Sequence, residues 1–427
     1  MMNMTAEKIA VEFDMFAEAE RLFSGLEATS TSTVGITREA YGKGEQKAVE
    51  LFITYAAEYG LETSFDGAGN LVIVLPGVNR NAPCIACGSH LDSVPQGGNF
   101  DGAAGIVAGV ISLARMQHES FVPACDLKVM AFRCEESAWY GKPYIGSSAL
   151  LGKLSVEDLE ARHRDGKITL AEAMKSSGAD LDRIFNGESL IDLKSIAAYL
   201  EIHIEQGPVM IARDLPTAVV TGIRGAIRHR KITCIGKAGH SGTVPRWLRQ
   251  DAFFATAELV SALDEHWRVL LERGLDIVVT SGIVETNAEV HAMTRIPDEI
   301  TFSLEIRSQS TDALEAFYHL MQTECNNIAR ERKVTFEFDR KLTTPPARMS
   351  ERWIERLKSI SEQLDLPSAL MPSGAGHDAA VFANAGIPTA MIFIRNDKGS
   401  HNPDESMTIE DFIKGTEILY HALKEPL

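Results

Sequence analysis

The sequence of 427 residues has little of what would mark several classes of protein. It contains six cysteines, too few to suggest a disulfide framework, and 42 basic residues against 59 acidic ones. The formal net charge of −17 argues against binding to nucleic acids or to anionic membrane surfaces, because both need clustered lysine and arginine. Charged residues make up 24% of the chain and hydrophobic residues 45%, as in an ordinary globular protein.

Long apolar runs are also missing. The longest apolar stretches, such as 383–394, contain glycine and proline and are shorter than the ~20 residues that a membrane-spanning helix needs. Residues 1–12 lack the basic segment and apolar segment of a signal peptide. We therefore predict a cytoplasmic protein that has neither a membrane nor a nucleic acid as a partner.

The first half of the chain alternates between helical and strand patterns. Apolar residues spaced three or four apart predict helices over 6–26 and 45–59, and a segment of small and apolar residues predicts a helix over 102–116. Short apolar runs between glycine, proline or polar residues predict buried strands at 71–75, 84–87, 127–132 and 199–204. This alternation favours an α/β fold with an open mixed sheet.

A different pattern begins near Pro216. Two long helices are predicted at 251–273 and 311–332, among strands at 228–235, 277–284, 300–307 and 334–338. These elements predict an α+β domain with a four-stranded sheet and two helices, inserted into the α/β domain. Another strand is predicted at 390–394. We therefore predict a catalytic domain in two parts, 1–215 and 342–427, with the inserted domain at 216–341.

Histidines and carboxylates follow several of the predicted strands. Ligands of open α/β sheets bind outside the carboxyl ends of the strands, and zinc, manganese and cobalt accept histidine and carboxylate ligands. Taken singly, each residue has a simpler explanation as a core residue, a surface residue or a helix cap. Their occurrence together predicts a metal site, with the candidates His90, Asp92, Asp101, Glu135, Glu136, His203 and His401.

Six motifs in this order resemble the hydantoinase/carbamoylase amidohydrolases. This family includes N-carbamoyl-L-amino-acid hydrolases, allantoate amidohydrolases and β-ureidopropionases, and it belongs to the dinuclear-metal aminoacylases and carboxypeptidases. The resemblance runs from about Gly35 to Glu405, and its 201–208 motif is specific to the carbamoylase branch. The motifs are GSHLDS at 88–93, GGNFDG at 97–102, Glu135–Glu136, EIHIEQGP at 201–208, AGHSG at 238–242 and SGAGHD at 373–378.

The resemblance implies a site for two divalent metal ions, whether zinc, manganese, cobalt or nickel. His90 and His203 would bind one ion, and Glu136 and His401 would bind the other. Asp101 would bridge the two. Such a pair lowers the pKa of a bridging water, so that hydroxide exists at neutral pH, and it polarises the scissile carbonyl.

The resemblance also implies three catalytic residues. Glu135 would be the general base that takes the proton of the water and passes it to the leaving nitrogen. Asp92 would accept the other ring N–H of His90 and so fix the orientation of that ring. His240 would stabilise the oxyanion from the inserted domain, reaching an active site across a homodimer. The alternative for His240 is a flexible turn.

The implied substrate contacts include one departure from the family. Arg307 ends a predicted strand and matches a substrate carboxylate, with an ion pair to Glu305 as the alternative. Where the family has two asparagines before this strand, this chain has His291 and Thr294. The contact of the second asparagine would therefore pass to the hydroxyl of Thr294. The remaining implied contacts are Gln206, Gly376, His377 and, again, His240.

These observations predict an amidohydrolase that cleaves the C–N bond of an N-carbamoyl amino acid or a related ureido acid such as allantoate. We expect a homodimer formed through the inserted domain, which would also be a lid. The altered asparagine stretch keeps open a second hypothesis, an N-acyl amino acid or dipeptide hydrolase with the same metals. A non-catalytic metal-binding protein is the third hypothesis, and the presence of Glu135 and all ligands disfavours it.

Overall fold

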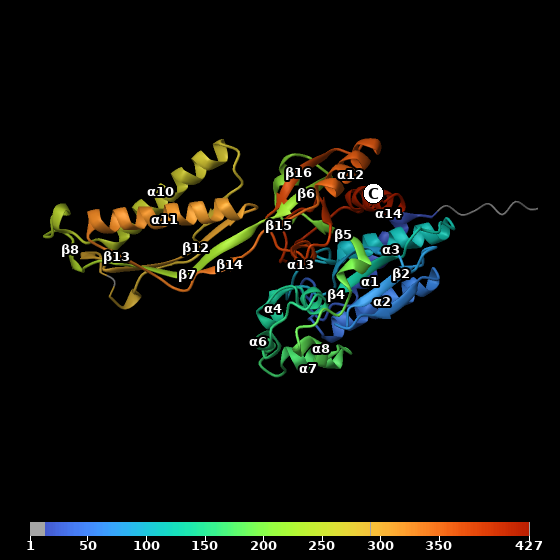
Figure 1. The fold of residues 1–427 in the computed structure, drawn as a ribbon. Helices are drawn as coiled ribbons and strands as arrows, with labels where there is room; N and C mark the ends of the chain where they lie inside the picture. The colour runs from blue at the N-terminus through green and yellow to red at the C-terminus, as the bar shows by residue number, and fades with distance from the viewer. Residues whose placement is uncertain (1–12, 291, 427) are drawn as a thin grey trace, which may run out of the picture. The chain divides into compact units, whose positions relative to one another are not determined.

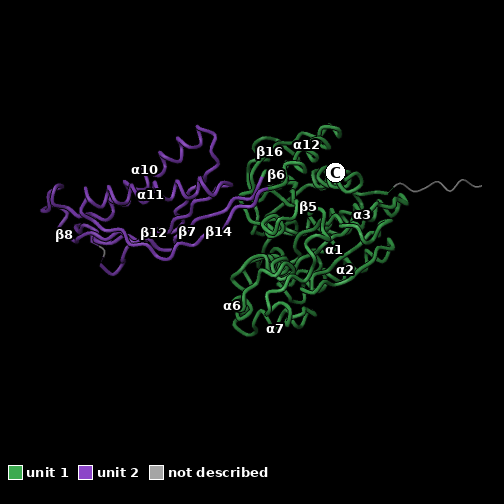
Figure 2. Tube along the Cα trace, in the orientation of Figure 1, with its two compact units in different colours: residues 1–221, 349–427 green, residues 222–348 purple. Residues whose placement is uncertain are grey.

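The computed structural model describes residues 13–290 and 292–426 (Figure 1). His291 and the first residues of the helix predicted at 6–26 therefore lie outside the described residues. The chain forms two compact units: unit 1 extends to Thr221 and resumes at Met349, and unit 2 is Gly222–Arg348 (Figure 2). In the part of the chain that the structure describes, no helix is long and apolar enough to cross a membrane.

A mixed central sheet forms the framework of unit 1. Its strands β3, β4, β5 and β17 are parallel, and β1, β2 and β6 pair antiparallel with their neighbours. This mixed sheet confirms the predicted α/β class. The strands follow in the order β1 (Glu62–Phe65), β2 (Leu71–Leu75), β4 (Leu127–Phe132), β3 (Cys84–His90), β5 (Ile196–Ile204), β17 (Thr389–Ile394), β6 (Thr217–Ile223) and β15 (Ala347–Arg348), with β16 (Ser368–Ser373) beside β6.

Helices cover this sheet because its strands are apolar on both faces. Every residue of β2 is buried, as are those of β3 and β17, so neither face of these strands meets solvent. The longer helices of unit 1 are α1 (Met15–Glu27), α2 (Lys43–Glu58), α3 (Ala103–His118), α12 (Glu351–Gln363) and α14 (Ile409–Lys424). Helix α3 packs on β3, β5 and α14, which places its N-terminus beside the carboxyl ends of the strands.

Shorter helices occupy the connections of unit 1. They are α4 (Ser137–Tyr140), α5 (Ile145–Leu150), α6 (Val156–Leu159), α7 (Leu170–Ser176), α8 (Leu181–Phe185), α9 (Val209–Ala212) and α13 (Asp378–Asn384), with a 3₁₀ turn at Leu193–Ser195. Helices α6 and α7 each begin with a capping box, Ser155 with Asp158 and Thr169 with Glu172. The predicted change of domain at Pro216 precedes β6, which pairs with β17 in the central sheet.

Unit 2 packs two long helices, α10 (Ala252–Glu272) and α11 (Thr311–Arg332), on one face of a second sheet (Figure 1). Its strands are β7 (Gly225–Ile235), β9 (Val278–Thr280), β10 (Val284–Glu285), β12 (Glu299–Ser308), β13 (Thr335–Phe338) and β14 (Leu342–Thr344). The prediction of four strands is wrong, because β9 and β10 both pair with β12, and β13 and β14 both pair with β7. The sheet therefore has six strands in four positions, because β9 and β10 share one edge and β13 and β14 share the other.

The alternation along β12 explains why α10 and α11 pack on one face of this sheet. Ile300, Phe302, Leu304 and Ile306 alternate along it and are buried in the core of unit 2. Glu305 and Arg307 therefore lie on the opposite face. A separate pair of short strands, β8 (Gly239–His240) and β11 (Arg295–Ile296), and 3₁₀ turns at Arg246–Leu248 and Ala288–Val290 complete the unit.

Candidate metal centre and active site

Four parallel strands of the central sheet end at one edge, and a predicted site residue lies at or after the end of each. His90 is the last residue of β3, and His203 is the penultimate residue of β5. Glu135 comes shortly after β4, and His401 follows β17. The structure thereby brings together the side chains of His90, Asp101, Glu135, Glu136, His203 and His401.

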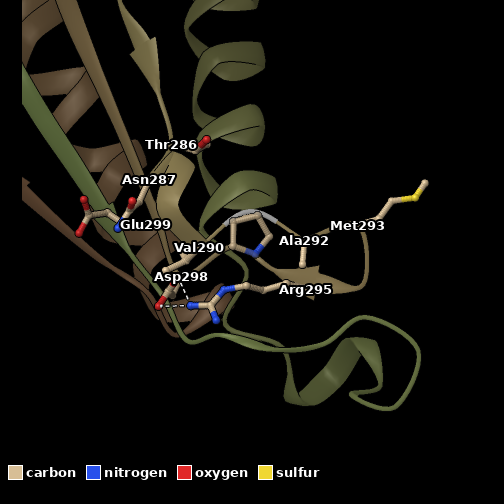
Figure 3. Close-up of a pocket in the computed structure, with 9 residues that line it drawn as sticks. Thr286, Asn287, Val290, Ala292, Met293, Arg295, Asp298 and Glu299 are labelled. Carbon is tan, nitrogen blue, oxygen red and sulfur yellow. Dashed lines mark hydrogen bonds and ion pairs between the residues drawn. The ribbon is translucent and has the colours of Figure 1, made fainter.

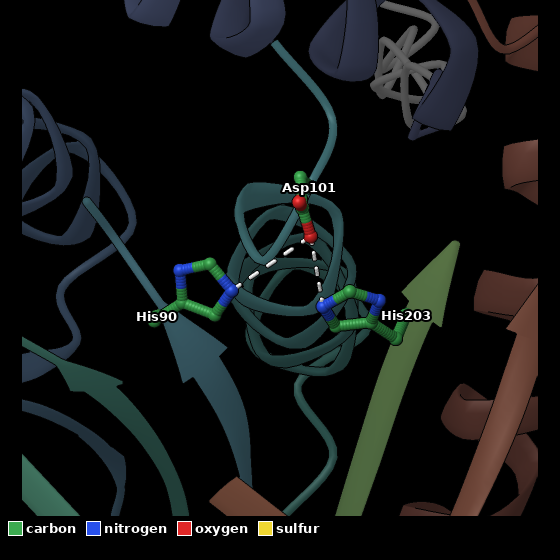
Figure 4. A group of neighbouring side chains, drawn as sticks. All are labelled: His90, Asp101 and His203. Carbon is green, nitrogen blue, oxygen red and sulfur yellow. Dashed lines mark ion pairs between the residues drawn. The ribbon is translucent and has the colours of Figure 1, made fainter. Parts of the chain in front are cut away.

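The first group of candidate ligands joins two strand ends to the turn before α3. The Asp101 Oδ1 atom lies 3.2 Å from Nε2 of His203 and 3.8 Å from Nε2 of His90. Both rings turn a nitrogen toward this carboxylate, and all three residues are buried (Figure 4). Their ligand atoms lie within 4.8 Å of one another, close enough to surround one ion.

The second group uses the other oxygen of the same carboxylate. Asp101 Oδ2 lies 3.1 Å from Nε2 of His401, and this nitrogen lies 3.2 Å from Oε1 of Glu136. The ligand atoms of Asp101, Glu136 and His401 also lie within 4.8 Å of one another. Asp101 thus presents one oxygen to each group, the arrangement that a bridging carboxylate requires.

Backbone carbonyls determine which nitrogen of each buried histidine faces the cluster. His90 Nδ1 lies 3.0 Å from the carbonyl oxygen of Asp92, and His203 Nδ1 lies 3.0 Å from that of Ile204. Because a carbonyl can only accept a hydrogen bond, each Nδ1 donates to its carbonyl, and Nε2 is the nitrogen of each ring that faces the cluster. Histidine and carboxylate donors arranged in this way fit divalent zinc, manganese, cobalt or nickel.

The Asp92 side chain holds the backbone of the loop at Glu135 and Glu136. Its Oδ1 accepts a hydrogen bond of 2.9 Å from the Glu135 backbone N–H, and its Oδ2 accepts one of 3.1 Å from that of Glu136. The same carboxylate lies 3.6 Å from His90 Nδ1, farther than the Asp92 carbonyl. From the sequence we expect the Asp92 carboxylate to accept the ring N–H of His90. In the structure, the nearer acceptor for this N–H is the backbone carbonyl of Asp92.

Replacing Asp92 by asparagine should destabilise the protein. The amide NH₂ would face one of the two backbone N–H groups, leaving a buried donor without an acceptor, at a cost of about 1–3 kcal/mol. Urea denaturation of the metal-free protein measures this loss. Asp182→Asn, at an exposed position on α8, is the matched control and should change the free energy of unfolding by less than about 0.5 kcal/mol. Equal stabilities of the two variants would contradict this role of Asp92.

Glu135 is a buried carboxylate close to His90. Its Oε2 atom lies 3.9 Å from His90 Nε2. Burial raises the pKa of Glu135 well above its usual range, and the charges of Glu136 and Asp378 add to this, while His90 opposes it. A carboxylate that binds a proton more readily than usual is suited to accept one from water at neutral pH.

Asp101 is held by neighbours from several loops. Gln206 Nε2 donates to its two oxygens over 3.2 and 3.1 Å, and the Ser400 hydroxyl lies 2.9 Å from Oδ2. Burial alone would raise the pKa of Asp101, but contacts with His203 and His401 hold it well below its usual range. The contacts with Asp101 and Glu136 raise the pKa of His401 to about 10. Asp101 is therefore an anion in the folded protein.

Gly102 allows His90 to approach the turn before α3. It has a φ of +66°, and a Cβ atom at this position would lie 2.4 Å from the His90 ring. A side chain there would both strain the backbone and displace the ring. The GGNFDG motif thus combines a ligand, Asp101, with the glycine that makes room for its neighbour.

His377 lies beside His203, and Gly376 precedes it in the chain. The rings of His377 and His203 are 4.3 Å apart, and the Ser373 hydroxyl lies 2.8 Å from His377 Nε2. Burial, together with the charge of His203, lowers the pKa of His377 well below its usual range, so this ring is neutral. A Cβ atom on Gly376 would lie 1.6 Å from the Tyr144 hydroxyl, which explains the glycine.

Three of the predicted contacts, His240, Thr294 and Arg307, belong to unit 2. His240 opposes Arg295 in the β8–β11 pair, and the Ser241 N–H donates to the Thr294 carbonyl over 2.8 Å, so Thr294 lies beside the His240 strand. Arg307 forms the ion pair with Glu305 that the sequence left as an alternative, with Nε 2.9 Å from Oε2.

Comparison with known proteins decides the family. A model of peptidase family M20/M25/M40 matches residues 86–425. The chain is 35% identical over 415 residues to an N-carbamoyl-L-amino acid amidohydrolase of Geobacillus stearothermophilus, covering 95% of this chain and 98% of that protein. The chain belongs to the M20 family. It is also 30% identical to an allantoate amidohydrolase of Escherichia coli (strain K12), covering 90% of this chain and 91% of the relative.

A solved structure agrees with this assignment. The crystal structure of a hydantoinase/carbamoylase family amidase from Burkholderia ambifaria matches with a TM-score of 0.85 and 26% identity, covering 97% of this chain and 96% of that one. The predicted resemblance to hydantoinase/carbamoylase amidohydrolases is therefore confirmed. The protein is an amidohydrolase of the metal-dependent M20 family.

The amidohydrolase also has buried polar residues to which the sequence assigned no role. Glu201 accepts hydrogen bonds from the Ser89 hydroxyl over 2.7 Å and from the Ala379 N–H over 2.8 Å. Burial, followed by the charge of Glu201, raises the pKa of Asp378 to about 7. The signal that could have identified them is the family resemblance, because Glu201 begins the EIHIEQGP motif and Asp378 ends the SGAGHD motif.

Two further buried charges hold the loops of the amidohydrolase's site. Arg38, which is fully buried, donates to the Leu91 carbonyl over 2.8 Å and to the Asn99 side chain over 2.9 Å. Glu405 accepts from the Phe100 and Asp101 N–H groups over 3.0 and 3.2 Å. Both residues lie at the ends of the stretch that resembles the family, which is the signal that could have identified them.

Ala292 and Met293, from the stretch where the family has asparagines, line a cavity of about 290 Å³ in unit 2 of the amidohydrolase (Figure 3). Arg295 forms an ion pair of 3.1 Å with Asp298 in its wall. The nearby Asn287 also lines the cavity, but its side chain accepts from the Glu289 N–H over 3.0 Å and so caps a 3₁₀ turn. Asn287 is thus engaged in local structure.

Proposed function

We propose that this amidohydrolase cleaves the carbamoyl C–N bond of an N-carbamoyl amino acid or a related ureido acid such as allantoate, using two divalent metal ions. The observation that supports this most strongly is the division of Asp101 between two groups of ligands. His90 and His203 would hold one ion with its Oδ1, and Glu136 and His401 the other with its Oδ2. When bound, such a pair supplies a water of lowered pKa and polarises the scissile carbonyl.

Glu135 would move the proton in this reaction. Its raised pKa and its position beside His90 support a role as the base that takes a proton from water. The same carboxyl would then donate this proton to the leaving nitrogen, since the amine must leave in protonated form. Asp92 would position Glu135 by holding the backbone of both glutamates.

Residues of unit 2 would also bind the substrate. His240 would donate a hydrogen bond to the oxyanion. Arg307 would bind the substrate carboxylate, and the Thr294 hydroxyl would take the place of the family's asparagine. In unit 1, Gln206, Gly376 and His377 would contact the substrate; the buried Gln206 Oε1 has no hydrogen-bond partner among the residues that the structure describes, which supports this role.

We also propose two further roles for unit 2: it would form the interface of a homodimer, and it would act as a lid. It carries large apolar side chains on its surface, among them Trp247, which is 73% exposed, and Phe253 and Phe254, each about half exposed. Exposed aromatic side chains are enriched at association surfaces. Sedimentation would test this: Phe253→Ser with Trp247→Ser should favour the monomer.

The substrate class can be tested with a panel of compounds. The metal-reconstituted enzyme is incubated with N-carbamoyl-L-amino acids, allantoate, N-acetyl amino acids and dipeptides, and ammonia and free amino groups are measured. Ammonia from the ureido acids is the expected result. Release of amino acids from the acyl compounds alone would select the second hypothesis, which Thr294 motivates. No turnover of any compound would contradict both.

A further inference from the structure

His240 lies in a loop that determines its protonation pattern. In this loop, Gly239–Val244, the Gly242 N–H donates to His240 Nδ1 over 3.1 Å. The Nδ1 atom is therefore an acceptor, and in a neutral ring the proton must be on Nε2. His240 is exposed, so this loop presents an Nε2–H donor, the group that an oxyanion requires.

Backbone pairing holds the Gly239–Val244 loop on one side only. The strand β8 pairs with β11, and the Ser241 N–H donates to the Thr294 carbonyl over 2.8 Å. Within the loop, the Thr243 and Val244 N–H groups donate to the His240 carbonyl, each over 3.2 Å. The carbonyls of Ser241 and Val244 remain to be satisfied from elsewhere.

The guanidinium of Arg249 donates to both of these carbonyls. Its Nε lies 3.0 Å from the Val244 oxygen, and its Nη2 donates to the Ser241 oxygen. Arg249 is linked in turn to Asp251, with Nη1 3.8 Å from Oδ2. Asp251 is buried and caps α10 by accepting from the Phe254 N–H over 3.2 Å. A continuous chain of contacts thus connects the first turn of α10 with the His240 loop.

A large cavity borders this connection. A cavity of about 710 Å³ lies against the loop and is lined by Ser241, Gly242, Val244 and Arg249, among others. Backbone carbonyls that border such a space need a donor with a fixed geometry, and the planar guanidinium supplies two N–H groups at once. A shorter or apolar side chain at position 249 would leave both carbonyls without this donor.

We propose that Arg249 is a positioning residue for His240. It fixes the Gly239–Val244 loop, so that the Gly242 N–H keeps His240 in the Nε2–H form and in one orientation. This inference depends on the proposed function, because His240 is a catalytic residue only if it contacts the reacting carbonyl. The tautomer of His240 does not depend on it and can be observed separately.

The kinetic test uses Arg249→Met and Arg249→Lys in the full-length enzyme with metal. Because small misplacements of a catalytic group can cost up to about 100-fold, Arg249→Met should lower kcat about 10- to 100-fold with little change in KM. The kcat of Arg249→Lys should lie between those of the wild type and Arg249→Met, since one ammonium cannot donate to both carbonyls in the arginine's geometry. Arg246→Met, a change in the wall of the same cavity, is the control and should keep wild-type kcat.

A second background separates positioning from structural support. In His240→Ala, the additional change Arg249→Met should lower kcat by less than about twofold, because there is no imidazole left to position. An equal loss in both backgrounds, or unchanged kcat in Arg249→Met, would overturn the proposal. Thermal unfolding shows whether Arg249→Met is folded. If it is not, the losses of kcat in the two backgrounds are compared with Arg249→Lys instead.

The tautomer supplies a readout that needs no substrate. In protein with ¹⁵N-labelled histidine, the signal assigned through His240→Ala should show a protonated Nε2 and an unprotonated Nδ1. Arg249→Met should shift it toward the average of a freely exchanging ring, and Arg246→Met should not. An unchanged signal in Arg249→Met would overturn the proposal. Absence of turnover in the wild type, with the expected shift present, would count against the proposed function alone.

Discussion

Replacing Glu135 by glutamine should lower kcat by about 10²–10⁴-fold, the usual contribution of a positioned general acid–base group. Glutamine has nearly the same shape and keeps the backbone hydrogen bonds to Asp92, but it can neither accept the proton of water nor return it to the leaving nitrogen. Because Glu135 is proposed as the base and not as a ligand, metal content should stay at the wild-type level. Ammonia release and elemental analysis on the same sample measure both quantities.

The matched control for this variant is Glu351→Gln, at an exposed position at the start of α12. It should keep full activity. A Glu135→Gln enzyme with full metal and full activity would show that another group accepts the proton. Loss of metal together with activity would instead assign Glu135 to the ligands, alongside His90 and Glu136.

Replacing Asp101 by asparagine should have the second large effect, on metal binding itself. Asparagine has one acceptor oxygen and no charge, so it cannot serve His203 through one oxygen and His401 through the other. Partners outside the ligand set already change metal affinity 10- to 100-fold, so loss of a shared ligand should weaken binding by at least about 100-fold. Equilibrium dialysis against zinc or manganese measures this.

Asp404→Asn, in the loop that carries His401, is the control for Asp101→Asn. Asp404 is exposed, so its replacement should leave metal binding and activity unchanged. If Asp101→Asn bound two metal ions with wild-type affinity, the bridging role would be wrong. The division of the site into two groups that share one carboxylate would then have to be abandoned.

Periodicity alone predicted much of the framework. The strands at 71–75 and 127–132 and the helix at 311–332 have the bounds of β2, β4 and α11, because each is an uninterrupted apolar or amphipathic pattern. Parallel pairing of β3, β4, β5 and β17 follows from the alternation of helices and strands. That pairing alone places His90 and His203 at one edge, since their positions at strand ends are set by sequence.

Other features depend on contacts that no pattern in the sequence records. The strand predicted at 277–284 is divided between β9 and β10, which meet different parts of β12. The support of His90 by the Asp92 carbonyl depends on how the chain turns after β3, and this turn frees the carboxylate for Glu135 and Glu136. The short helices of 145–185 have too few turns for a helical period to be visible.

The roles proposed for unit 2 depend on chemistry that motifs describe only partly. The AGHSG motif identifies His240 through the resemblance, but the proton on its Nε2 follows from the Gly242 N–H, and the support from Arg249 lies outside the motif. For Arg307, the strand pattern placed it beside Glu305 on one face of β12, where the two form an ion pair. Alternation along this strand thus indicated both the face on which Arg307 lies and its neighbour Glu305.

In the proposed function, two ions that share Asp101 would make this chain a ureido-acid amidohydrolase. One titration tests it: metal-free protein receives increasing manganese or zinc, and ammonia release from an N-carbamoyl-L-amino acid is recorded at each ratio. We expect no release without metal and a rate that rises until about two equivalents per chain and then stays constant. A rate that is already constant at one equivalent, or no ammonia at any ratio, would contradict it.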